Sequence, residues 1–261
     1  MKKYLAIVQM QVINNIAYPG DFIGRSISIG IFLFIFAGLW KTTFTIAGTD
    51  VINGLTLANM LWYLMMAETI ELGRPRINRV ISEQVKNGEV AYILSKPYNF
   101  LLYHFSFGLG DSLMRIGMNI LVGVGVTWLL AGPPPSLLGW LMALTTMVGA
   151  WVLHFCMMAL IGLTAFVVEE TNSFELIYQK AVFILGGMLL PLDMFPVWLQ
   201  GIARALPFPY MMYAPARLFV KPEVDLFWQM LAGQWIWVAV LVFALAMAYR
   251  SGEKVLTVNG G

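Results

Sequence analysis

Four polar or ionisable side chains interrupt long apolar stretches of the chain: Asp111, Arg115, Asn119 and His154. Asp111 and Arg115 are four residues apart, so on a helix they share a face and can form an ion pair. Placing an ionisable group in the middle of a membrane span costs roughly 2.5–3.5 kcal/mol on insertion scales, and such groups often serve function. Two interpretations are open: a substrate, proton or ion path, or a structural ion pair with a packed, hydrogen-bonded histidine.

Motifs for covalent or metal-assisted catalysis are absent from the sequence. It contains no GxxxxGK[ST] phosphate loop, no HExxH and no GxSxG. A single cysteine, Cys156, excludes an internal disulfide and a cysteine metal cluster. We therefore expect no catalytic residue, no metal site and no cofactor in this chain, and no ATP hydrolysis by the chain alone.

Residues 73–103 form the longest polar interval, and most of their charges are positive. Within it, the segment 76–86 has apolar residues on one side of a helix and Arg79, Glu83 and Lys86 on another. The Asn87-Gly88 pair that follows is a helix-terminating signal. The pattern predicts a short amphipathic helix, whose charges either face solvent or meet a partner protein.

The composition of the chain indicates what kind of helices position these polar side chains. The chain has 261 residues, of which 59% are hydrophobic and 11% charged, whereas soluble domains have about 25% charged residues. We therefore expect an all-α integral membrane protein with one domain, residues 1–261. Its apolar stretches predict six transmembrane helices, at residues 22–40, 53–72, 104–130, 137–168, 177–192 and 227–249.

Two segments outside the spans have patterns of their own. Residues 1–20 place apolar side chains at helical spacing and end at Pro19-Gly20, which predicts an amphipathic helix lying in the membrane interface. Residues 193–226 are apolar but rich in proline. We expect the fifth helix to be broken at Pro191 and to be followed by short helices that re-enter the outer leaflet.

Orientation follows from the lysines and arginines. Most of them fall on the side of residues 73–103, while the opposite side has Lys41, Arg204, Arg217 and Lys221. The excess of positive charge marks the cytoplasmic side. With six spans, both termini are then expected in the cytoplasm.

Particular stretches within this layout resemble the permease subunits of bacterial ABC exporters of the ABC-2 type. The run NGEVAYILSKPYNFLLY (residues 87–103) is similar to that family's Gly-Glu…Leu-x-x-Pro pattern. The run GGMLLPLDMFPVWLQGIARALPFPYMMYAP (residues 186–215) is similar to its broken fifth helix and outer hairpin. The N-terminal helix and the Gly260-Gly261 ending also match. This chain departs from some members of the family in one respect: the loops between its predicted spans are short, so it lacks the large outer domain that those members have.

The resemblance implies an ATP-driven exporter in the bacterial inner membrane. Two ATPase subunits, which carry ATP and Mg, would dock beneath this permease and a second permease, identical or homologous. The membrane lipids are the other expected partner, and no nucleic acid is expected. The ATPase-coupling residues would be Arg76, Arg79, Glu83 and Lys86 in the main coupling helix, with Glu169 and Glu170 in a second contact at residues 169–174.

Other functions are open at this point. A stand-alone channel or proton-coupled transporter could use Asp111, Arg115 and His154 as its path. An intramembrane enzyme is a third class, which the missing motifs disfavour. The substrate is not readable from the residues; a drug-like or amphipathic small molecule is the expectation, with lipids and glycans as alternatives.

Overall fold

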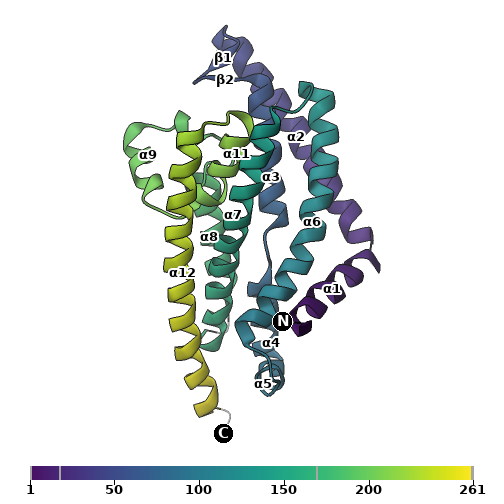
Figure 1. Ribbon diagram of the computed structural model, residues 1–261, viewed down its shortest axis with the longest axis vertical. Coiled ribbons are helices and arrows are strands. Elements are labelled where there is room, and N and C mark those ends of the chain that lie inside the picture. The colour runs from purple at the N-terminus through teal and green to yellow at the C-terminus, as the bar shows by residue number, and fades with distance from the viewer. Residues whose placement is uncertain (1, 18, 169, 260–261) are drawn as a thin grey trace.

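The computed structural model describes residues 2–17, 19–168 and 170–259, and these form an elongated bundle of helices (Figure 1). The first half contains α1 (Lys2–Ala17), α2 (Pro19–Ala47), β1 (Val51–Ile52), β2 (Leu55–Thr56), α3 (Leu57–Gly73), α4 (Ile77–Lys86), α5 (Glu89–Leu94) and α6 (Phe100–Ala131). The second half contains α7 (Leu137–Leu163), α8 (Asn172–Leu185), α9 (Val197–Arg204), α10 (Phe208–Met211), α11 (Tyr213–Val220) and α12 (Val224–Asn259). Short 3-10 turns follow α7 at Thr164–Phe166 and precede α9 at Leu192–Met194.

Within the described residues, four helices are long and apolar enough to cross a membrane, in line with an all-α membrane protein. They cover residues 27–47, 100–131, 137–166 and 224–252. The second and fifth predicted spans correspond to α3, with 17 residues, and α8, with 14. Both are shorter than the roughly 20 residues that an upright span needs. The prediction of six spans therefore stays a prediction.

Helix α3 is the centre of the hydrophobic core. Residues from Met60 to Ile70 are buried, and the helix packs against α2, α6 and α11. A helix that is apolar on all sides is stable only when other helices surround it. Because α3 continues directly into α4 through a short linker, the core is connected to the polar segment.

The first long helix extends further than the sequence suggested. We expected a loop after Trp40, but α2 continues to Ala47. The side chains of Thr42, Thr43 and Thr45 donate hydrogen bonds to backbone carbonyls four residues earlier, so these polar residues fit within a helix. The hairpin β1–β2 then makes the turn into α3, with Val51 opposite Thr56.

The proline-rich segment folds into short helices, as expected. Helix α11 is buried along its whole length and packs against α3 and α7. Helix α9, in contrast, exposes Val197, Trp198 and Ile202. How deeply this segment enters a membrane stays a prediction.

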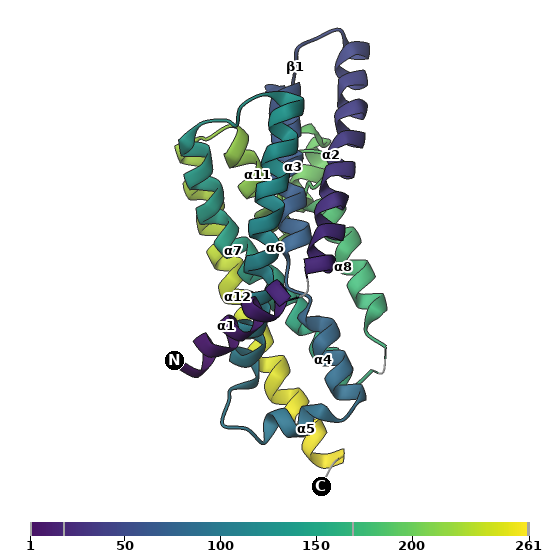
Figure 2. The ribbon, with the colours of Figure 1, turned by 90° about the vertical axis from the view of Figure 1, so that its right-hand side faces the viewer.

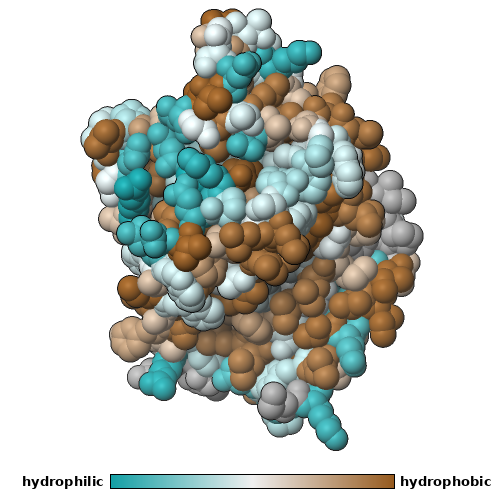
Figure 3. All heavy atoms as spheres, turned by 45° about the horizontal axis from the view of Figure 1, so that its top comes forward, coloured by the Kyte–Doolittle hydropathy of each residue, from teal (hydrophilic) through white to brown (hydrophobic). Residues whose placement is uncertain are grey.

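The two ends of the bundle differ (Figures 1 and 2). Both termini, α4 and α5 lie at the lower end, while the β-hairpin, α9 and α11 lie at the upper end. With the upper end tipped forward, hydrophilic side chains gather over it and hydrophobic ones occupy much of the remaining visible surface (Figure 3). The lower end contains residues 77–94 of the polar segment that was predicted to face the cytoplasm, and this orientation stays a prediction.

Helix α1 lies obliquely across the lower part of α6 (Figure 2) and packs against it. Their close approach depends on Gly110, where a Cβ atom would lie 2.7 Å from the carbonyl oxygen of Val8. The side chains of Leu5, Ile13 and Ile16 are exposed. The predicted N-terminal helix therefore exists, and its exposed apolar side chains suit a membrane interface.

Candidate functional site

Helix α4 is the amphipathic helix that the sequence predicts within the central polar segment. Ile77 and Ile81 are buried, whereas Arg79, Glu83 and Lys86 are exposed. Arg76 is the N-cap residue, just before the helix begins. The helix ends as predicted, because Gly88 has a φ of 74°, a left-handed conformation in which glycine is favoured.

The buried side of α4 rests on the lower end of α7. This approach is close: a Cβ atom at Gly162 would lie 3.0 Å from Ile81 Cδ1 and 3.1 Å from Asn78 Cα. Glycine therefore permits α4 to lie directly on the α7 backbone. Helix α4 thus packs directly on a helix that is long enough to span a membrane.

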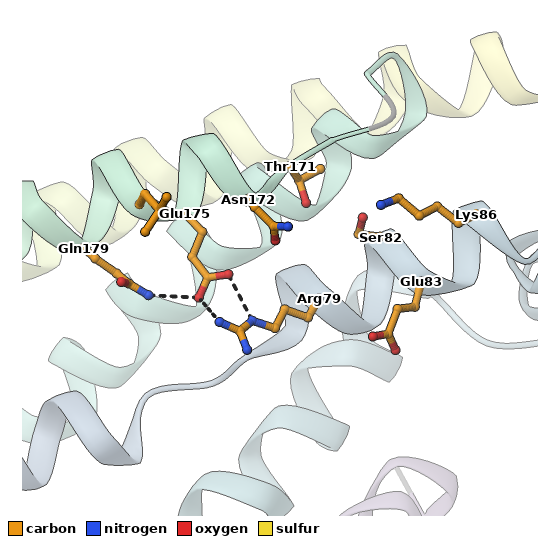
Figure 4. A pocket seen from close by; sticks show the side chains of 9 residues that line it. Arg79, Ser82, Glu83, Lys86, Thr171, Asn172, Glu175 and Gln179 are labelled. Atoms are coloured by element: carbon orange, nitrogen blue, oxygen red, sulfur yellow. Dashed lines mark hydrogen bonds and ion pairs between the residues drawn. The ribbon is translucent and has the colours of Figure 1, made fainter.

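The carboxylate of Glu175, in the first turn of α8, joins α4 to α8 (Figure 4). Arg79 binds it in a bidentate manner, with Nε 3.1 Å from Oε2 and Nη2 3.1 Å from Oε1. Asn78 Nδ2 donates to Oε2 at 2.9 Å, and Gln179 Nε2 donates to Oε1 at 3.0 Å. Arg74 Nη2 lies 3.8 Å from Oε1. We call Arg74, Asn78, Arg79 and Glu175 the α4–α8 junction.

The electrostatics of this junction keep its acid charged. Burial works to raise the pKa of the Glu175 carboxyl. Hydrogen bonds from Arg79 and Asn78, together with the positive charges of Arg79 and Arg74, outweigh burial, and the pKa lies below its usual value. The hydrogen bond to Glu175 in turn raises the pKa of Arg79. At neutral pH the junction is therefore a fully formed ion pair.

An open cavity of about 440 Å³ lies between α4 and the start of α8 (Figure 4). Arg79, Glu83 and Lys86 line it from α4, and Thr171, Asn172 and Glu175 line it from the other side. At its edge, Lys86 Nζ lies 3.8 Å from Glu170 Oε2. The two predicted coupling segments therefore face each other. Glu169, also predicted for this contact, lies outside the described residues, as do Gly260 and Gly261.

The residue that makes the junction was not singled out from the sequence. The predicted second contact ended at residue 174, one position before Glu175. Arg74 and Asn78 were also not identified from the sequence, and the structure shows that both are buried. A signal was present: Glu175 is an acid at the beginning of an apolar run, a position that requires a partner. Its partners on α4, Asn78 and Arg79, could not be found from spacing, because they lie 97 and 96 residues away.

The pair predicted within the apolar stretches forms as the spacing suggested. Arg115 Nη2 donates to Asp111 Oδ2. Arg115 also reaches the backbone carbonyl of Leu72 in α3 at 3.5 Å, and Asn15 of α1 donates to Asp111 Oδ1 at 3.3 Å. Asn119 is buried further along α6. The pair thus connects α1, α3 and α6, which is a structural role; a part in a substrate path stays a prediction.

His154 lies in different surroundings. Its Nδ1 atom is 2.6 Å from Tyr178 Oη in α8, and that hydroxyl donates to Met211 Sδ at 3.4 Å. These contacts involve α7, α8 and α10, whereas Asp111 and Arg115 contact α1 and α3. His154 therefore lies in a different cluster of helices from Asp111 and Arg115, and a role for it in a proton or substrate path stays a prediction.

Comparison with known proteins adds one finding. A family model described as an ABC-2 family transporter protein matches residues 24–260, which is nearly the whole chain. No curated protein matches the sequence.

Proposed function

The chain belongs to the ABC-2 transporter family, and from this premise we propose that it is the permease of an ATP-driven exporter whose ATPase docks on α4. The observation that carries the proposal is the α4–α8 junction. An exposed amphipathic helix at one end of the bundle is tied by an ion pair to a second, partly apolar helix. Such a helix can receive force and transmit it.

In this mechanism the chain supplies the moving parts and a separate ATPase supplies the energy. The ATPase contacts the exposed side chains of Glu83 and Lys86. Its closure displaces α4, which moves α7 through Asn78 and Ile81 and moves α8 through Glu175. Closely packed helices switch between discrete arrangements instead of deforming continuously, so a shift of one helix moves the helices packed against it. The substrate then passes to the opposite side by alternating access.

The assembly and the cargo follow from the same premise. Two ATPase copies and a second permease, identical or homologous, complete the exporter, with both termini and α4 in the cytoplasm of a bacterial cell. ATP and Mg bind on the ATPase. The short β1–β2 hairpin and α9 form a small outer face, which favours a drug-like or amphipathic small molecule over a bulky polymer.

A double charge reversal on α4, Glu83→Lys with Lys86→Glu, tests the docking. It leaves the net charge and the junction in place, and it removes an exposed ion pair to Glu170 that is worth about 1 kcal/mol or less. We expect unchanged thermal stability, a loss of transport of roughly tenfold or more, and ATP hydrolysis that no longer responds to substrate. Transport and ATPase assays of the reconstituted complex measure both.

A matched variant, Lys41→Glu, changes an exposed charge at the other end of the bundle and should leave both activities unchanged. Full transport by the double variant would remove α4 as the docking helix.

A further inference from the structure

An apolar groove lies between α6 and α7, away from the α4–α8 junction. The groove exists because these helices pack mainly against other partners: α6 against α1, α2 and α3, and α7 against α4, α11 and α12. Its volume is about 360 Å³. Leu109, Ser112, Leu113 and Ile116 line it from α6, and Leu144, Met147, Val148 and Trp151 line it from α7. Leu113, Leu144 and Val148 are exposed, so the groove is open to the surroundings of the bundle.

Two hydrogen-bond donors in this groove lack a partner among the residues that the structure describes. Ser112 is fully buried and Trp151 is 7% exposed, yet neither Ser112 Oγ nor Trp151 Nε1 makes a hydrogen bond to any described residue. A buried polar atom without a partner destabilises the protein, so both donors are expected to bind an acceptor that comes from outside the chain. Among the described residues that line the groove, none is charged. The complementary ligand is therefore apolar, with a neutral acceptor.

The level of Ser112 and Trp151 relative to the predicted membrane interface indicates which apolar ligand with a neutral acceptor could reach them. Helix α1, the predicted interfacial helix, meets α6 at Gly110 and Asp111. Ser112 is the next residue of α6, about 1.5 Å further along the helix axis. An interfacial helix lies at the boundary between headgroups and acyl chains. The ester carbonyls of membrane lipids are found near this boundary.

We propose that the groove between α6 and α7 binds a diacyl glycerolipid of the leaflet that contains α1. The ester carbonyl accepts hydrogen bonds from Ser112 and Trp151. Since α6 and α7 are antiparallel, Ile116 and Leu144 lie at the other end of the groove, and the acyl chain runs toward them between Leu113 and Val148. The lipid fills the space that the two diverging helices leave open.

A photoactivatable diazirine amino acid in place of Val148 tests the proposal on the full chain. The chain is placed in nanodiscs of palmitoyl-oleoyl phosphatidylethanolamine mixed equally with its dialkyl ether analogue, which lacks the carbonyl. Mass spectrometry of the adducts then gives the ratio of ester to ether lipid. Each neutral hydrogen bond of about 1 kcal/mol contributes about fivefold, so the two bonds together predict a ratio of roughly 25. The same probe at Leu121, which is exposed on α6 outside the groove, should give a ratio near one.

The donors are tested by removing them. Ser112→Ala and Trp151→Phe should each lower the ratio at Val148, and the double variant should bring it to about one without changing the ratio at Leu121. A ratio of one at Val148 in the unaltered background would overturn the ester contact. Polypeptide adducts at Val148 would overturn the lipid itself, because they would mean that a second copy or a partner protein covers the groove.

Discussion

Replacing Glu175 by alanine should abolish ATP-driven transport and destabilise the chain. The substitution leaves Arg74 and Asn78 buried without the carboxylate, and it leaves Arg79 without its bidentate acceptor. Arg79 is half-exposed, and Arg74 keeps its ion pair with Glu71, whose Oε1 lies 3.1 Å from Arg74 Nε. The main cost is therefore the loss of the buried polar contacts to Asn78 and Arg74, about 1–3 kcal/mol. Helix α4 then loses its connection to α8, and movement imposed on α4 no longer reaches that helix. Thermal unfolding of the purified chain and transport by the reconstituted complex measure the two effects.

Two further variants separate the mechanical effect from misfolding. Glu175→Gln keeps the shape and one acceptor oxygen but loses the charge, so we expect a folded chain with transport reduced at least severalfold. Glu83→Ala removes an acid of α4 that is exposed and outside the junction, and its stability should be unchanged. Normal transport by a folded Glu175→Gln variant would show that the junction does not carry the movement.

The second large effect is expected at Arg217, at the opposite end of the bundle. Its side chain is 9% exposed. Nε lies 3.0 Å from Asp193 Oδ2, Nη2 lies 2.9 Å from Glu223 Oε1, and Nη1 donates to the carbonyl of Lys221 at 2.8 Å. One side chain thus ties the turn before α9, the helix α11 and the start of α12 together. Because Asp193 and Glu223 are 30% and 46% exposed, water partly solvates them once the arginine is gone. Arg217→Ala should therefore cost about 2 kcal/mol and lower the melting temperature by roughly 6 °C.

Arg204→Ala is the matched control, because Arg204 is exposed on α9 and its side chain bonds to Gln200 of the same helix. That variant should melt within a degree or two of the unaltered chain. Equal melting temperatures for the two arginine variants would mean that the proline-rich segment is held by apolar packing alone.

The general architecture could be predicted from composition and periodicity. Scarcity of charge indicated a membrane protein, and the 76–86 pattern indicated α4 together with its end at Gly88. Asp111 and Arg115 could be paired from their spacing, because a helix brings residues four apart together whatever the tertiary fold. Local rules suffice for contacts of this kind.

Contacts between distant segments could not be predicted in the same way. Glu175 and its partners on α4 are brought together by the packing of α4 on α7, which no local pattern encodes. Arg79 was predicted to contact the ATPase, and the sequence did not indicate that its guanidinium also binds Glu175 within the chain. The ATPase contact of Arg79 stays a prediction. The length of α2 was also underestimated, because hydroxyl groups that bond within a helix look like loop residues in a hydropathy pattern.

The most direct test of the account is photocrosslinking from α4 in the native membrane. A diazirine amino acid replaces Glu83, which is exposed on α4, and a second variant carries it at Val197, which is 86% exposed on α9 at the other end. We expect a crosslink from position 83 to an ABC ATPase, with a yield that changes when ATP is added, and no such product from position 197. An ATPase captured at position 197, or none at position 83, would contradict it.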